Sequence, residues 1–106
     1  MPKILWKVKY SSEGAKGVLK DGGSKRKAVV EELLRAHGGR LECFYFAFGD
    51  DDAYLIADVP SNTEAAATAM VVGASGAAQL STTVLLTPEE IDAAAKVSLD
   101  YRPPGT

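Results

Sequence analysis

The sequence lacks several features that would identify a class of protein directly. Its 106 residues include one cysteine, Cys43, and one histidine, His37. A single cysteine cannot form an intramolecular disulfide or supply the paired thiolates of a structural zinc site, and one histidine cannot build a multi-histidine metal site. No apolar run approaches the roughly 18 residues of a membrane span, and the N-terminus has no signal-peptide-like apolar region. We therefore expect a cytoplasmic protein without a metal, another cofactor or a membrane partner.

The composition is that of a globular protein. Apolar residues make up 46% of the chain and charged residues 25%, which separates it from disordered chains. The length suits one hydrophobic core, because domains most often contain roughly 100–150 residues. We predict a single domain over residues 1–97 and a C-terminal tail over residues 98–106.

The charges are divided unevenly along the chain, although the formal net charge is only −2. Residues 1–40 carry ten basic and four acidic side chains, whereas residues 41–106 carry two and ten. This division favours self-association or an anionic ligand on the basic side. The simpler interpretation, which we favour, is that the charges cancel once the two halves interleave in the fold. The negative net charge argues against nucleic acid as a partner.

Hydrophobic periodicity predicts the secondary structure. Apolar residues at every second position indicate a strand, and apolar residues spaced three and four apart indicate a helix. Ser24, the pair Ser61 and Glu64, and Thr87 are typical of helix starts, and Gly38 is typical of a helix end. The glycine-rich segment 11–23 is expected to form only a short, loose helical turn. The predicted strands are 4–10, 41–48, 53–59 and 77–86, and the predicted helices are 24–37, 61–74 and one that follows Thr87.

This order, β-α-β-β-α-β with a terminal helix, predicts an α+β fold of the ferredoxin-like class. Four antiparallel strands would carry helices on one face and leave the other face uncovered. Because the strand 41–48 is apolar on both sides, the uncovered face would expose one of two sets. These are Phe44, Phe46 and Phe48, or Leu41, Cys43 and Tyr45. An exposed apolar patch of this kind predicts a sheet-to-sheet homodimer or a higher homo-oligomer.

Several segments carry a family resemblance. They are Gly22-Gly23-Ser24-Lys25-Arg26, GGRLECFYFAFGD (38–50), Ala74-Ser75-Gly76-Ala77 and TTVLLTPEE (82–90). With these segments the chain resembles the GYD-domain family, a bacterial family without an assigned activity. The resemblance implies a dimeric α/β barrel, in which two ferredoxin-like sheets pair. The chain departs from the family in one place: Asp51 stands where the family usually has the tyrosine before its name-giving aspartate, Asp52, although Tyr54 lies nearby.

The start of the helix 24–37 is a candidate anion site. Glycine amides and a helix N-terminus favour anions, and Ser24, Lys25 and Arg26 stand there. Because the lysine of the Walker motif is missing, nucleotide hydrolysis has no support. The simpler interpretation is an ordinary helix cap with a solvated basic first turn. The run Asp50 to Asp52 is likewise interpreted as a solvated turn, because it lacks the spacing of a calcium loop.

Two functional hypotheses remain. In the first, the protein binds a small organic molecule or a small anion without chemistry, and Trp6, Phe44, Phe46 and Tyr54 line its pocket, although we expect most of these aromatic residues to be core. In the second, it is a cofactor-independent monooxygenase or isomerase in which His37 or Tyr45 is the acid-base group. A solvent-open pocket that His37 or a tyrosine hydroxyl reaches favours the enzyme, and a filled interior favours the first hypothesis. For His37 a structural role at the helix end is the simpler interpretation.

Overall fold

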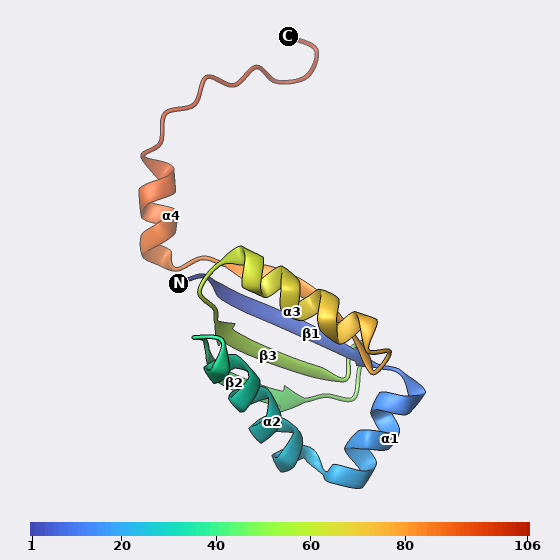
Figure 1. The fold of residues 1–106 in the computed structure, drawn as a ribbon. Helices are drawn as coiled ribbons and strands as arrows, with labels where there is room; N and C mark the ends of the chain where they lie inside the picture. Colours follow the sequence, from blue (N-terminus) through green and yellow to red (C-terminus); the bar gives the residue numbers. More distant parts are fainter.

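The computed structural model describes residues 1–106 and contains one four-stranded antiparallel sheet in the order β2-β3-β1-β4, with four helices (Figure 1). The predicted α+β ferredoxin-like fold is confirmed, with one helix more than predicted. The elements are β1 (Lys3–Tyr10), α1 (Ser12–Asp21), α2 (Gly23–Ala36), β2 (Arg40–Phe46), β3 (Ala53–Asp58), α3 (Asn62–Ala74), β4 (Ala78–Leu85) and α4 (Pro88–Ala95).

The core is built on β1, which lies at the centre of the sheet between β3 and β4. Ile4, Trp6 and Val8 alternate along this strand and are buried. They pack in one cluster with Leu34 of α2 and Ala65 of α3, the helices that cover this face of the sheet. Because β3 pairs with β1 in register, its alternate residues Leu55 and Ala57 join the same cluster. The sequence pattern of β1 therefore fixed which face of the sheet is the core.

Strand β2 does not place either of the two predicted sets of residues together on one face of the sheet. Phe44 is buried on the helix side and Phe46 lies next to it, with ring centroids 5.1 Å apart. The pairing of β2 with β3 is irregular between Leu41 and Cys43. This bulge keeps Leu41 opposite Ala57 and against the core, although two-residue periodicity grouped it with Cys43.

The strand is also shorter than predicted. It ends at Phe46 rather than at residue 48, and Phe48 is fully exposed in the turn that follows. The backbone N–H of Ala47 donates to the carbonyl of Asp52 at 2.9 Å, which closes the turn early.

The face of the sheet away from the helices, called the open face below, carries both apolar and polar side chains. Leu5 and Ile56 are half-buried at its centre, beside the more exposed Tyr45 and Tyr54. Ser81 and Thr83 on β4 make its other side polar. The register places the following residues on this face: Lys3, Leu5, Lys7, Lys9, Arg40, Cys43, Tyr45, Tyr54, Ile56, Asp58, Gln79, Ser81, Thr83 and Leu85.

The segment after β1 corrects the prediction of a short helical turn. It forms the ten-residue helix α1, whose N-cap Ser11 accepts a hydrogen bond from the backbone N–H of Gly14 at 3.1 Å. A Cβ at Gly14 would lie 1.9 Å from the carbonyl oxygen of Ala77. Glycine here therefore permits close packing of the helix on the chain before β4, instead of preventing a helix.

The start of α2 also differs from the prediction. The helix begins at Gly23, so Ser24 lies inside its first turn and is not the N-cap. Gly22 takes that position with φ of 83°, a value that glycine adopts without strain. A glycine cap supplies no side-chain oxygen, so the residue type favoured the serine two positions later.

The caps of the last two helices are confirmed. Ser61 is the N-cap of α3 and accepts from the N–H of Glu64, and its hydroxyl also donates to the Glu64 carboxylate. Thr87 and Glu90 form a full capping box at α4. This last helix and the chain after it lead away from the sheet (Figure 1). No helix is long and apolar enough to cross a membrane.

Candidate functional site

The helices α2 and α3 lie side by side on the sheet but do not close over it. Helix α2 packs mainly on β2 and α3 on β4 (Figure 1). A groove lined by residues of both helices lies between them. Its wide part has a volume of about 200 Å³ and its narrow part about 50 Å³. Because Leu33, Leu34, Thr68 and Val72 line both parts, we treat them as one site, the α2–α3 groove.

One side of α2 forms a wall of this groove. Arg26, Val30, Leu33 and His37 are spaced four, three and four residues apart, which aligns them along the helix. The wall therefore carries a cation at one end, an apolar middle and an imidazole at the other end. Val72 and Leu80 extend the apolar lining on the opposite side.

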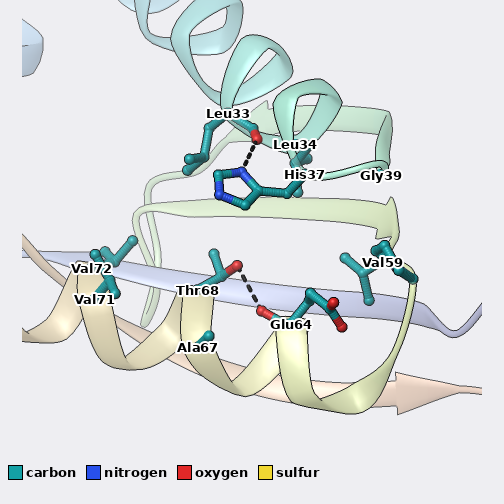
Figure 2. Close-up of a pocket in the computed structure, with 11 residues that line it drawn as sticks. Leu33, Leu34, His37, Gly39, Val59, Glu64, Ala67, Thr68, Val71 and Val72 are labelled. Atoms are coloured by element: carbon teal, nitrogen blue, oxygen red, sulfur yellow. Dashed lines mark hydrogen bonds between the residues drawn. The ribbon is translucent and has the colours of Figure 1, made fainter.

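His37, predicted as a catalytic candidate, lines the wide part of the groove (Figure 2). Its Nδ1 lies 3.0 Å from the carbonyl oxygen of Leu33. A carbonyl oxygen only accepts, so Nδ1 is the nitrogen that donates in this contact. In the neutral ring Nε2 then keeps its lone pair, which can accept a hydrogen bond or a proton from a ligand.

Two polar residues of α3 face His37 across the wide part. Thr68 donates its hydroxyl hydrogen to the backbone carbonyl of Glu64 at 2.9 Å (Figure 2). Glu64 is half-buried, and its carboxylate accepts from the hydroxyl of Ser61. The groups that remain available for hydrogen bonds to a ligand at this end of the groove are therefore mainly acceptors. Neither residue was predicted as part of a site. Their spacing of four on the helix after Pro60 is the only sequence signal, and Glu64 had been assigned to the cap alone.

Arg26 is the part of the predicted anion site that reaches the groove. It is half-buried and lines the narrow part, and its guanidinium makes no ion pair or hydrogen bond. Ser24 and Lys25 are exposed outside the groove, and the Lys25 ammonium lies 3.6 Å from the carboxylate of Asp21. The predicted cluster of three residues is therefore divided, because successive helical residues point in different directions.

The predicted aromatic pocket is divided as well. Trp6 and Phe44 line the floor of the narrow part, and the Trp6 indole N–H donates to the hydroxyl of Thr82 at 3.0 Å. Phe46 lies outside the groove, beside the start of α2, where its ring would be 2.9 Å from a Cβ at Gly23. Tyr54 lies on the open face, opposite to the groove.

Tyr45, the other catalytic candidate, also lies on the open face, as the register partner of Tyr54. It is 70% exposed and does not line the groove. The sheet therefore separates its hydroxyl from His37.

The open face carries a network of ion pairs where β1 and β2 begin and β3 ends. The Lys3 ammonium lies 3.0 Å from the Glu42 carboxylate and 3.1 Å from that of Asp58, which Arg40 approaches to 3.3 Å. The hydrogen bonds to Glu42 and Asp58 raise the pKa of Lys3. Burial raises the pKa of Asp58, but the hydrogen bonds from Lys3 and Arg40 outweigh it, so its pKa is lowered overall. Each of these four charged side chains therefore has a partner of opposite charge on the same face.

No group of three or more His, Cys, Asp or Glu side chains is placed to hold a metal ion. A protein-family model described as GYD domain matches residues 5–95 of the chain. No curated protein and no solved structure matches the chain.

Proposed function

The chain belongs to the GYD-domain family, and from this premise together with the groove we propose that it binds a small organic molecule between α2 and α3. The observation that carries the proposal is the groove itself. It is concave and mostly apolar, and it has a few polar groups at defined positions, as ligand sites in proteins have.

The exposure of the groove walls favours a ligand-binding role for the groove over the alternative of a filled hydrophobic core. Leu33 is 42% exposed and Val71 70% exposed, although both line a concave surface. Apolar side chains that stay exposed in a concavity gain free energy when a ligand removes them from water, at about 25 cal/mol per Å². The floor, with Trp6 and Leu34, is already buried and gives a ligand a fixed surface to rest on.

The proposal includes a homodimer formed through the open face in the bacterial cytoplasm. The central Leu5 and Ile56 of that face, with Tyr45 and Tyr54, offer the apolar part of a self-complementary interface. Helix α4 gives a second, independent argument for a partner subunit. It has eight residues, leads away from its own sheet and exposes half of Ile91, whereas isolated helices this short are only marginally stable in water.

A neutral fluorescent probe tests the binding site. N-Phenyl-1-naphthylamine becomes strongly fluorescent in apolar sites, so we expect enhancement with the wild-type protein. Ala67 lines the groove, and the larger side chain of Ala67→Phe should fill it and weaken the affinity for the probe by about tenfold or more. The adjacent Ala66 is exposed outside the groove, so Ala66→Phe is the matched control and should bind like wild type. A folded wild type that gives no enhancement, or equal binding by the two variants, would refute the site.

A second candidate function is catalysis by His37, and the position of its ring favours it. The contact of Nδ1 with Leu33 orients the imidazole so that Nε2 can act as a general base in the groove. An isomerase of this type would remove a proton from the bound molecule and return it. His37→Gln should then retain the ligand but abolish exchange of its hydrogen for deuterium in D₂O. Equal exchange in wild type and variant would leave the binding function alone.

A further inference from the structure

We propose that the ligand of the α2–α3 groove is an organic acid, with its carboxylate at Arg26 and its apolar body along the wall towards His37. This inference rests on the proposed binding function and names the chemical class of the ligand. It is carried by the combination of one half-buried arginine residue, which has no partner in the protein, with a groove that is otherwise mainly apolar.

Arg26 has no anionic partner within the protein. Every ion pair of the chain involves other residues: Lys3 with Glu42 and Asp58, Lys16 with Glu13, Lys25 with Asp21, and Arg40 with Asp58. The guanidinium also makes no hydrogen bond to a backbone carbonyl. A cation that lines an apolar groove and has no partner in the protein is free to pair with the anionic group of a ligand. The planar guanidinium suits a carboxylate because both can join through two parallel hydrogen bonds.

The acidic side of the groove lies at the opposite end. Glu64 is the only carboxylate among the lining residues, and it lines the wide part beside His37 (Figure 2). Arg26 precedes His37 by eleven residues on α2, which corresponds to about 16 Å along the helix axis. The two ends therefore differ in charge, and a carboxylate is attracted to the Arg26 end and repelled from the Glu64 end.

The surface between the two ends is apolar. Val30 and Leu33 on α2 face Val72 on α3, and Leu80 lies beside them on β4. An aliphatic or aromatic body would cover these side chains while the carboxylate stays at Arg26. An inorganic anion would leave them exposed, so the groove fits an organic acid better than phosphate or sulfate.

Three probes with the same eight-carbon chain test this inference: octanoate, octan-1-ol and octylammonium. Trp6 is the only tryptophan and lines the same narrow part of the groove as Arg26, so its fluorescence reports on this site, and calorimetry gives an independent affinity. We expect octanoate to bind about tenfold more tightly than octan-1-ol, and octylammonium to bind most weakly.

Substitutions at Arg26 then locate the effect. Arg26→Gln should remove the preference for octanoate over octan-1-ol, and Arg26→Lys should keep part of it. Lys25→Gln removes an exposed cation of the same helical turn and should leave the preference unchanged. Circular dichroism shows whether each variant is folded, and the comparison of the three probes on the wild type needs no variant.

The outcomes separate the inference from the function on which it rests. Equal binding of octanoate and octan-1-ol, or tightest binding of octylammonium, would overturn the inference that the ligand is an organic acid but keep the groove as a binding site. A preference for octanoate that survives in a folded Arg26→Gln would also overturn the role of Arg26. If none of the three probes binds and N-phenyl-1-naphthylamine does not bind either, both the inference and the proposed function are refuted.

Discussion

The carboxylate of Asp52 accepts a hydrogen bond from the backbone N–H of Tyr10 at 2.8 Å, across 42 residues of sequence. The backbone N–H of Asp52 donates to the carbonyl of Val8, also at 2.8 Å. The turn before β3 is thereby attached to the end of β1. Asp52 therefore has a structural role, which the interpretation of the acidic run as a solvated turn did not include.

We predict that Asp52→Ala lowers the free energy of unfolding by about 1.5–3 kcal/mol, because a charge-assisted hydrogen bond is lost and the N–H of Tyr10 is left without a partner. Urea unfolding measures the difference. Asp50→Ala is the control, since its side chain is exposed and only its backbone carbonyl is used, by Lys9. Equal stability of the two variants would contradict the role of Asp52.

Two glycines of α1 should respond in opposite directions to alanine. A Cβ at Gly14 would meet the carbonyl oxygen of Ala77, so Gly14→Ala should destabilise the protein by about 1–3 kcal/mol. Gly17 has open space around its Cβ position, so Gly17→Ala should stabilise the helix by about 0.5–1 kcal/mol. Thermal unfolding of both variants checks the prediction. A neutral Gly14→Ala would show that α1 does not pack on Ala77 as described.

The ion pairs of Asp58 should make stability depend on pH. The pKa of Asp58 is lowered in the folded protein, whereas an unfolded aspartate has a pKa of about 3.9. Its contribution to stability is therefore present above pH about 4 and is lost as the pH falls through the lowered folded-state value. We expect wild type to be more stable than Asp58→Asn at pH 7, by an amount that shrinks below pH 4 in urea unfolding.

Lys3 works in the opposite direction. Its pKa is raised in the folded protein, so its contribution is present below about pH 10.5 and is lost as the pH rises through the folded-state value. Asp92→Asn on α4 is the control for the comparison of wild type with Asp58→Asn, because Asp92 has no ion pair. A wild-type advantage over Asp58→Asn that stays constant from pH 7 to pH 2 would show that these ion pairs do not set the dependence.

The proposed dimer predicts a different behaviour for two apolar positions. Ile56 lies at the centre of the open face, and Ile56→Lys should convert a wild-type dimer into a folded monomer. Met70 is exposed on α3 outside the groove, and Met70→Lys should remain a dimer. Sedimentation at micromolar concentration and native mass spectrometry measure the assembly. A monomeric wild type, or a dimeric Ile56→Lys, would refute the interface.

The predicted domain boundary can be tested by ending the chain at Val97. The hydrogen bonds of the tail, from Arg102 to Thr106 and from Thr106 to Pro103, close within the tail. We therefore expect the free energy of unfolding to stay within about 0.5 kcal/mol of the full chain, as for changes away from the packed body. A loss well above this value would show that the tail contributes to the folded protein.

The sequence by itself determined the order of the four strands and of the helices α2, α3 and α4, and the inner face of the central strand, but not the helix α1. The alternation of Ile4, Trp6 and Val8 is a local pattern, and the structure buries all three residues. The caps Ser61 and Thr87 were equally readable, because a cap involves neighbours within one helical turn. His37 could be singled out because it is the only histidine.

Only the tertiary structure decided which side chains meet. The bulge between Leu41 and Cys43 depends on pairing with β3, so a strand that is apolar on both sides could not reveal it. Likewise, Arg26 and Thr68 line the same groove because α2 and α3 stand apart on the sheet. Periodicity describes one element at a time, whereas the separation of two helices follows from the long-range packing of each on a different strand.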